Sequence, residues 1–479
     1  MKRRPLVFGT LVATLIAASA TMTTTARSAG LYFSDRGVRP MGRAGAFVAG
    51  ADDLGATWYN PAGIVDAGPS FLADFAWLRF SDSYTRQLQV VDADGTIRNV
   101  NSPTIQGSSP VLPLPTLVGS FALDDDRRWI VALGVLAPYV ALASYPDALA
   151  DGSPSPARYT LGSFNGSALA LPGAWIAWKP VEWLRVGAGV MALAGIFEST
   201  ITFSASPQDR LLGAPEQPEF DAASQVRAGP IFAPSVSGGV IVEPDPHVRI
   251  GLSAQSPFYV DAPATIKVRL PSDVAFDGAS INGDQARISF TLPGIFRAGV
   301  EVRPLHDGRD LRIELAYVRE FWGEHQTIEI KPQGMTITGI TAGPPSVTFP
   351  NISIPRGFQD SNSFRLGAEG SVKVSGYRVD LRGGVAYESS AVPADYLSLS
   401  SLDFTKIYVM SGGSLHIGKR WRFDAVLGHT FASTTYVDPA TAQIPRINPL
   451  KGNAPMEAVN GGTYGATADL IGVGMAYAM

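Results

Sequence analysis

Apolar and polar residues alternate along much of the chain beyond residue 70, and the clearest run covers 377–388. Its odd positions are mostly Tyr, Val and Leu, whereas four of its even positions are charged. A period of two places each class on one face of a β-strand. This pattern recurs in 311–320, 364–374 and 421–431. Strands of this kind are typical of a barrel wall with lipid outside and a polar lumen inside.

The same pattern predicts roughly fourteen strands, an even number that suits a bacterial outer-membrane barrel. Short connections alternate with long ones, as periplasmic turns alternate with outer loops in such barrels. A soluble β-sandwich would also alternate in polarity, but it has no reason to sort its loops by length. We therefore predict an all-β fold, a 14-stranded antiparallel transmembrane β-barrel with both termini periplasmic. The strands are expected to begin near residues 70, 112, 128, 166, 183, 232, 247, 287, 309, 363, 376, 404, 420 and 464, and the long connections to be 81–110, 141–164, 205–230, 260–286, 325–361, 389–403 and 435–462.

The first residues have the features of an export signal. Lys2, Arg3 and Arg4 precede an apolar stretch over 5–20, and small residues follow. The apolar stretch is shorter than the roughly 18 residues that a spanning helix needs. Cleavage after residue 20 or after residue 28 would satisfy the small-residue rule. We assign 1–28 to a signal peptide and the mature chain to the cell outer membrane.

A Gly- and Ala-rich stretch, 39–64, lies between this signal and the first strand. It is too rich in small residues for a barrel strand and too short for a domain. We predict that 29–69 forms an N-terminal hatch, or plug, of short helices inside the lumen, and that 70–479 forms the barrel. Residues 45–50 have phosphate-loop spacing, but Ala51 and Asp52 stand where Lys and Ser or Thr are required. Phosphate binding is therefore not expected.

Composition and charge reduce the number of possible partners and modifications. The chain of 479 residues is 46% hydrophobic and 17% charged, with a formal charge of −4 and no cysteine. Mild acidity argues against a nucleic-acid partner, and the absence of cysteine excludes disulfides and lipid attachment to a thiol. The five histidines show no metal-binding spacing. We expect no cofactor and no metal.

A series of short motifs along the chain carries a family resemblance. In this order they are similar to the long-chain fatty acid and toluene outer-membrane transporter family. That family folds as a 14-stranded barrel with an N-terminal hatch, which agrees with the strand count made from the polarity pattern. The motifs are Gly42-Arg43-Ala44, Ala51-Asp52-Asp53, Asn60-Pro61-Ala62, Ala137-Pro138-Tyr139, Arg158-Tyr159, the stretch 382–388 and Asn460-Gly461-Gly462-Thr463-Tyr464.

The resemblance implies a transporter rather than an enzyme. It implies passive uptake of long-chain fatty acids or aromatic hydrocarbons, which bind between outer loops and move to a pocket above the hatch. The ligand then leaves sideways through a gap made by a kink in the third strand. The expected partners are this hydrophobic ligand and the lipid and lipopolysaccharide of the outer membrane, and we expect a monomer.

Three groups of residues are candidates for these roles. We expect the hatch to be pinned by Gly42, Arg43, Ala44, Asp52, Asp53, Asn60, Pro61 and Ala62. We expect Gly134 and Pro138 of the third strand, with Pro172 of its neighbour, to form the lateral gate, with the ladder unpaired near Gly134. In the alternative interpretation, Pro138 only terminates the strand. The candidates for ligand contact are Arg158, Tyr159 and Tyr139.

Charged residues on predicted lumen positions have two interpretations. Paired charges would brace the wall and hold the hatch, or one arginine would meet a ligand carboxylate. The set is Arg297, Glu301, Arg312, Glu314, Arg365, Glu369, Arg378, Asp380, Arg382, Arg422 and Asp424.

Two other functions remain open. A general diffusion porin would share the barrel but would lack a hatch. An outer-membrane lipase would need a serine beside a wall histidine, for which His416 and His429 on adjacent predicted strands are the candidates.

Overall fold

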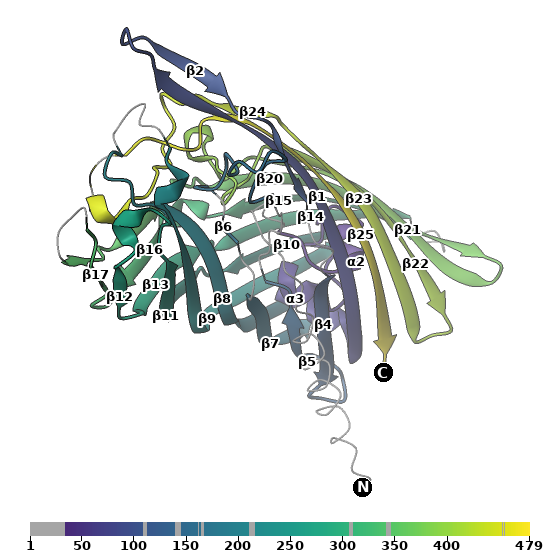
Figure 1. Cartoon of the computed structure of the whole chain (residues 1–479). Helices are drawn as coiled ribbons and strands as arrows, with labels where there is room; N and C mark the ends of the chain where they lie inside the picture. The colour runs from purple at the N-terminus through teal and green to yellow at the C-terminus, as the bar shows by residue number, and fades with distance from the viewer. Residues whose placement is uncertain are drawn as a thin grey trace.

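The computed structural model describes residues 34–479, apart from the positions given at the end of this paragraph. Within them the chain forms one closed antiparallel wall around a short N-terminal segment (Figure 1). The predicted signal peptide lies outside the described residues, and so does Tyr139. The undescribed internal positions are 109–112, 139–144, 161, 164–166, 210–215, 306–309, 342–345, 453 and 455.

The wall has the fourteen strands that the polarity pattern predicts. The last strand pairs with the first from Ser70–Ala478 to Arg86–Gly462, which closes the barrel. In order round the wall, with interrupted strands given as two segments, the strands are β1 (Ser70–Val91), β3 with β4 (Ile105–Ser108, Pro113–Ala122), β5 (Trp129–Leu136), β6 with β7 (Gly162–Ser163, Ala168–Val181), β8 (Leu184–Ser204), β9 (Asp221–Asp245), β10 with β11 (Val248–Gln255, Phe258–Arg269), β13 with β14 (Gln285–Leu292, Ile295–Leu305), β15 with β16 (Leu311–Glu320, Thr327–Pro332), β19 with β20 (Ile352–Pro355, Ser361–Val374), β21 (Tyr377–Glu388), β22 (Lys406–Ile417), β23 with β24 (Trp421–Ala432, Thr435–Val437) and β25 (Gly462–Ala478).

The two ends of the barrel differ. At the end where β1 begins and β25 stops, here named the turn end, the connections are short, as between β20 and β21. At the opposite end, the loop end, β1 extends into a hairpin with β2 (Ile97–Asn101) that stands away from the wall (Figure 1). Small elements occupy the other loops: β12 (Ser280–Asn282), β17 (Thr336–Thr338), β18 (Ser346–Thr348), η2 (Pro218–Phe220), η3 (Val274–Phe276), η4 (Trp322–Glu324), η5 (Ala394–Tyr396) and η6 (Pro449–Lys451).

Several strands extend further toward the loop end than predicted. The sixth strand, β9, begins at Asp221 rather than near 232, and parts of β11, β16 and β19 occupy stretches predicted as loops. The exposed positions of this part of β9 include Gln225 and Arg227. A strand beyond the membrane has no lipid to select apolar outward residues, so its polarity pattern disappears while its hydrogen bonds remain. The predicted bounds of these strands and of the neighbouring loops were therefore wrong.

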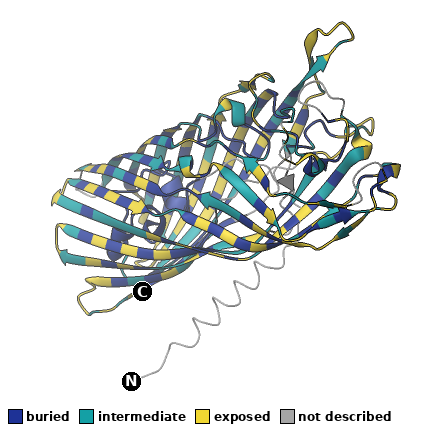
Figure 2. Cartoon of the chain, turned by 90° about the vertical axis from the view of Figure 1, so that its left-hand side faces the viewer, coloured by how far each residue is buried: buried dark blue, intermediate teal, exposed yellow. Residues whose placement is uncertain are grey.

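The wall is apolar on its outer face, as predicted. In β21, Leu381 and Tyr387 are exposed, whereas Asp380 and Arg382 are buried toward the lumen. Figure 2 shows the resulting bands of buried and exposed residues along the strands. Aromatic side chains gather near the turn end, where Trp129 stacks on Trp178 with ring centroids 4.9 Å apart. Aromatic girdles of this kind are usual where a barrel meets the membrane interface.

The N-terminal segment, residues 34–69, lies inside the wall (Figure 1). It contains α2 (Val38–Met41), α3 (Ala56–Tyr59), η1 (Pro61–Gly63) and α4 (Ile64–Ala67). These helices are too short to be stable alone, so their contacts with the wall must hold them. Nearly every residue from Ser34 to Val65 is buried.

Candidate functional site

The turn half of the lumen is filled by ion pairs between the N-terminal segment and the wall. Arg43 is fully buried, and its guanidinium lies 2.9 Å from Glu301 and 3.2 Å from Glu314. Glu314 also accepts hydrogen bonds from the backbone N–H groups of Val48, Ala49 and Gly50. A buried carboxylate needs such partners to offset its lost hydration. One glutamate of the wall therefore holds both a side chain and a turn of the segment.

A second ion cluster surrounds Asp52 and Asp53. Asp52 lies 2.6 Å from both Arg39 and Arg312, and Asp53 lies 2.6 Å from Arg422. Burial alone would raise the pKa of Asp52, but the guanidiniums of Arg312 and Arg39 outweigh it and hold the pKa well below its usual range. Burial opposes Arg422 and Arg39 in the same way at Asp53, whose pKa is also lowered. Both carboxylates are therefore ionised at neutral pH.

Most of the lumen charges of the wall are mutually paired, as the structural interpretation predicted, and Arg297 lies over the rings of Trp58 and Tyr59 of the N-terminal segment. Arg382 bonds Glu369 at 3.0 Å and approaches Asp424 at 3.4 Å, while Arg365 pairs with Asp35 of the N-terminal segment. Arg378 differs, because it lies half-exposed at the turn end beside Asp380. The guanidinium groups of Arg382 and Arg365 are therefore already bound by carboxylates of the barrel and of the N-terminal segment.

Asn60, Pro61 and Ala62 join the segment to β8 and β9. The Asn60 amide donates to the Val48 carbonyl at 2.9 Å and to the Val240 carbonyl of β9 at 3.2 Å. Its side-chain oxygen accepts from the Ala62 N–H and caps η1. A Cβ at Gly187 of β8 would overlap the Pro61 backbone. The wall is thus shaped to this turn of the segment.

Close contacts with wall glycines recur around the lumen. A Cβ at Gly251 would overlap Val48, and one at Gly384 would overlap the backbone of Arg43 and Ala44. Gly42 is itself confined, because a Cβ there would stand 2.7 Å from Arg382. Glycine permits such close approach of two backbones. The segment therefore fills the lumen at this level, which sequence reasoning expected of a hatch.

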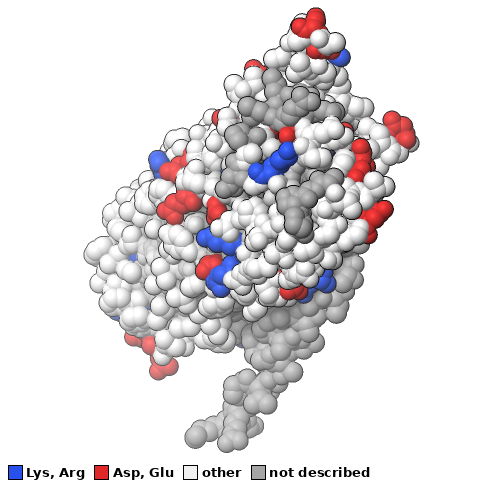
Figure 3. Space-filling model, turned by 60° about the vertical axis from the view of Figure 1, so that its left-hand side comes forward, with Lys and Arg blue, Asp and Glu red and all other residues white. Residues whose placement is uncertain are grey.

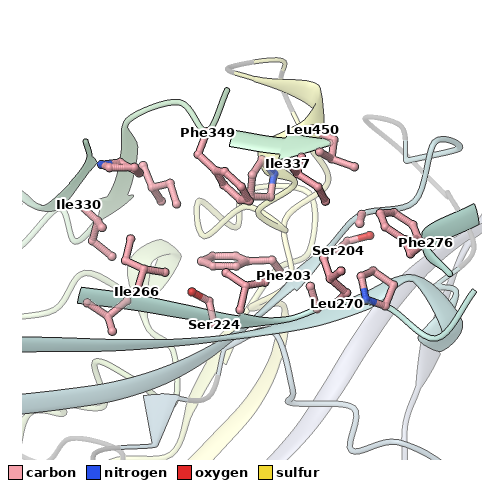
Figure 4. A pocket seen from close by; sticks show the side chains of 18 residues that line it. Phe203, Ser204, Ser224, Ile266, Leu270, Phe276, Ile330, Ile337, Phe349 and Leu450 are labelled. Atoms are coloured by element: carbon pink, nitrogen blue, oxygen red, sulfur yellow. The ribbon is translucent and has the colours of Figure 1, made fainter. Parts of the chain in front are cut away.

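The loop half contains an apolar pocket instead. Its empty space is about 590 Å³ including the solvent at its open side, and only serines interrupt its apolar lining. Figure 4 shows Phe203 and Ile266 on one side and Phe349, Ile337 and Leu450 on the other. The lining comes from the ends of β8, β9, β11 and β16 and from loop elements: Phe203, Ser204, Ala205, Ala222, Ser224, Val226, Ile266, Val268, Leu270, Pro271, Phe276, Ile330, Pro332, Ile337, Phe349, Ile352, Pro449 and Leu450.

The predicted break at Gly134 is absent. Gly134 pairs with Val118 of β4 and with Gly173 of β7, so the ladder is continuous on both sides. Gly134 has no side chain, so the strand fits against Val118 of β4 at this position without a bulge. Described pairing of β5 instead ends at Leu136, after which the Ala137 N–H donates to the Pro115 carbonyl. The expectation for Gly134 was therefore wrong.

The other two gate candidates lie at irregular positions. Pro138 follows the end of β5, and Arg36 of the N-terminal segment donates to the carbonyls of Ala137 at 2.9 Å and Pro138 at 2.7 Å. Pro172 pairs with Val135 of β5, but the pairing of β7 with β8 omits Leu171 and Pro172. Because proline lacks an N–H, it cannot complete a ladder on both sides.

Arg158 is half-buried and Tyr159 is buried in the loops, and both contact carboxylates. The Arg158 guanidinium lies 2.7 Å from Asp221 and 2.8 Å from Glu216, and the Tyr159 hydroxyl donates to Asp221. Asp221 adjoins Ala222 of the pocket. The geometry gives these two residues a place at the pocket edge, where they hold the start of β9.

A lipase site or a metal site has little support among the described residues. His416 bonds Asp380 and His429 bonds Asp469, each at 2.7 Å, and within the described residues neither histidine bonds a serine hydroxyl. The described residues hold no group of three or more His, Cys, Asp or Glu that could bind a metal. No helix in the described part of the chain is long and apolar enough to cross a membrane. On the face seen in Figure 3, broad uncharged areas separate the charged side chains.

A closed barrel with an apolar outer face, a filled turn half and an apolar pocket defines an outer-membrane channel for hydrophobic molecules. The comparisons agree with this class. Residues 19–477 match the family described as "Outer membrane protein transport protein (OMPP1/FadL/TodX)", and the chain belongs to this family. The protein is thus an outer-membrane transporter of hydrophobic compounds and not an enzyme.

Solved structures share the fold at low sequence identity. A Pseudomonas aeruginosa FadL homologue is 12% identical with a TM-score of 0.67, over 94% of this chain and 99% of that one. The Ralstonia pickettii toluene transporter TbuX is 16% identical with a TM-score of 0.55, over 93% and 99% of the two chains. The P. putida toluene transporter TodX is 14% identical with a TM-score of 0.56, over 93% and 98%. No curated protein sequence matches significantly.

Sequence reasoning expected a pocket above the hatch from the family resemblance, but it named none of the residues that line the apolar pocket and did not identify the glycine contacts with the N-terminal segment. Apolar residues inside the long loops, such as Phe276 and Phe349, were an available signal, because a solvent-exposed loop seldom carries them without a partner. The glycines had no signal of their own, since glycine in a strand has several uses. Arg36 and Arg39 could have been noticed as charges in an otherwise small-residue segment.

Proposed function

We propose that this protein carries long-chain fatty acids or aromatic hydrocarbons passively from the loop end into the outer membrane by a lateral route. The loop end faces the exterior and the turn end the periplasm, in keeping with the usual placing of long loops and short turns. The apolar pocket receives the molecule, because its lining can bury an apolar surface and presents no charge.

One observation carries the lateral route. The N-terminal segment fills the lumen toward the turn end with buried charges and close glycine contacts. An apolar molecule would have to displace these ion pairs to continue along the barrel axis. A general diffusion porin needs an open axis instead. The filled lumen therefore favours a lateral exit over the porin alternative.

The end of β5 is the proposed exit. Strand β4 continues for three residues beyond its pair with Leu136, to Pro113, and β7 continues for three beyond its pair, to Ala168. The described pairing of the third strand thus ends before that of its neighbours. In this proposal Pro138 and Pro172 border the exit, which corrects the position expected from Gly134.

Uptake assays can test the function and its route. Cells expressing the chain should take up labelled oleate or toluene several-fold faster than cells without it, and small hydrophilic solutes should show no gain. In the Ala137→Trp variant an indole would stand where β5 leaves the wall, so uptake should fall while binding of the hydrophobe to purified protein persists.

The control is Ala174→Trp, a lipid-side position on β7 whose side chain does not reach the exit. Equal uptake of hydrophilic solutes would support the porin instead. Unchanged hydrophobe uptake in Ala137→Trp would refute the exit at β5, even if transport itself is confirmed.

A further inference from the structure

A row of polar groups crosses the inner wall directly beyond the N-terminal segment. Strand pairing places Trp175 of β7 opposite Gly189, Gly189 opposite Ser237, and Ser237 opposite Gln255. Directly opposite residues of antiparallel strands face the same side of the sheet. These residues therefore form one lateral row on the lumen face.

The polar atoms of this row lack partners in the described structure. Trp175 Nε1, Ser237 Oγ and both polar atoms of the Gln255 amide are buried without a hydrogen bond to any described residue. The residues Trp175 and Gln255 are 2% and 5% exposed. A buried polar group without a partner costs about 1–3 kcal/mol, and native proteins contain few of them. Three such residues in one row indicate a site for an external partner.

The wall around Trp175 is adapted to hold its indole. A Cβ at Gly189 would overlap Cδ1 of the indole and lie 2.6 Å from Nε1. The pyrrole edge of the ring, with Nε1, therefore lies over β8, while its six-membered ring lies against Gly173 of β7. As a result, Nε1, Ser237 and Gln255 occupy three adjacent strands, about 4.8 Å apart from one strand to the next.

The row lies next to the top of the N-terminal segment. Gly187 and Gly239, which contact Pro61 and Asn60, are two residues closer to the turn end than Gly189 and Ser237. Ser253, two residues before Gln255, donates to the Tyr59 carbonyl at 2.6 Å. The wall positions toward the turn end are thus occupied by the segment, whereas the row is the first level beyond it.

An apolar lane connects the pocket with this row. The inward residues of β9 and β11 between them are apolar except for Ser235, and the apolar ones are buried in the main hydrophobic cluster. Val226 and Ile266 belong both to the lane and to the pocket. The lane consists of Val226, Ala228, Ile231 and Ala233 on β9 and Ile266, Ala264, Ala262, Val260 and Phe258 on β11.

Resting on the function proposed above, we propose that the row of Trp175, Ser237 and Gln255 binds the hydroxyl head of an uncharged amphiphile, such as a long-chain alcohol, whose apolar body lies along the lane. The indole donates, and the serine and amide both donate and accept, which matches a hydroxyl group. A carboxylate fits less well, because the row contains no cation and continues through Ile295 to the carboxylate of Glu320. An alkane would leave the polar groups without partners.

Competition binding to the purified full chain in detergent tests this inference. The probe is N-phenyl-1-naphthylamine, and the competitors are 1-decanol, decane and decanoate at pH 8. The wild type should bind decanol more tightly than either of the others. Gln255→Leu and Ser237→Ala should each weaken decanol binding roughly three- to tenfold, the value of a hydrogen bond, and leave decane binding unchanged.

Ser235→Ala is the matched control. Ser235 lies two residues away on the same strand and also faces the lumen, but its hydroxyl already donates to the Ser256 carbonyl at 2.7 Å. Its loss should not change the ratio of decanol to decane binding. A Trp175→Phe variant keeps an aromatic ring but removes the N–H donor together with the volume of the second ring. It should lower the ratio of decanol to decane binding, as Gln255→Leu does, if folding is retained in thermal unfolding.

Three results would overturn the inference. Decanoate could bind more tightly than decanol, the Gln255→Leu ratio could stay at the wild-type value, or Ser235→Ala could change it equally. In each case the competitors still displace the probe, so the proposed function survives. Failure of all three competitors to displace the probe would refute both proposals.

Discussion

The turn half and the loop half of the lumen differ in the chemistry of their linings and in what they contain. In the turn half, buried charges such as Arg43 and Glu314 have partners within the same chain, and glycines such as Gly384 fit its backbone. In the loop half, the lining is apolar and the polar groups of Trp175 and Gln255 have no partner among the described residues. We infer that the turn half of the lumen is shaped to hold the N-terminal segment permanently, whereas the loop half is shaped to receive a molecule from outside.

The largest expected effect comes from removing Arg43. An Arg43→Met variant leaves Glu314 buried without its cation, which should cost about 3–5 kcal/mol. We expect the N-terminal segment to leave its place and small hydrophilic solutes to leak through the barrel. Liposome swelling measures the leak. The control is Arg98→Met, whose pair with Asp92 is exposed and worth at most about 1 kcal/mol. A wild-type leak rate in Arg43→Met would contradict the ascribed role.

Two neighbouring glycines of β21 give a sharper test of the fit. Gly384→Ala should displace Arg43 and Ala44, because a Cβ there overlaps their backbone, and overpacking of this kind costs about 1–3 kcal/mol. Gly383→Ala places its Cβ 3.8 Å from the Met410 carbonyl and should be tolerated. Thermal unfolding and leakage should change only in the first variant. Equal behaviour of the two would show that the glycine fit is unimportant.

Asn60 should have a smaller effect. Asn60→Ala removes the hydrogen bonds to Val48, Ala62 and Val240, and we expect a loss of about 1–3 kcal/mol confined to the N-terminal segment. Uptake should change while the barrel stays folded, as judged by circular dichroism and proteolysis of the segment. Asn101→Ala on the exposed hairpin is the control. Unchanged uptake with an intact segment would refute a pinning role for Asn60.

The smallest effect in ordinary conditions is that of pH. Because the pKa values of Asp52 and Asp53 are lowered on folding, their stabilisation is fully present above the ordinary aspartate pKa of about 3.9 and is lost as pH falls below it. The protection factors for hydrogen exchange in the segment, which are corrected for the intrinsic pH dependence of amide exchange, should therefore be the same at pH 7 and pH 5 and lower at pH 3. Lower protection already at pH 5 would show that other groups control the segment.

The amino-acid sequence by itself determined the wall and its contents in outline. The period of two in 377–388 specifies which face meets lipid, because a strand side chain can only point to one side or the other. The charges it assigned to the lumen are the ones that pair there, as Arg382 does with Glu369. The export signal, the small-residue stretch 39–64 and the loop lengths indicated a filled outer-membrane barrel.

Only the tertiary structure decided where segments remote in the chain meet. The pocket combines Phe203, Ile266, Phe349 and Leu450, and no local pattern relates their positions. The continuous pairing of β5 through Gly134, where a break was predicted, depends on β4 and β7, and the row from Trp175 to Gln255 depends on register across four strands. Local polarity specifies the face of a residue, whereas its neighbours across the sheet follow from closure of the whole barrel.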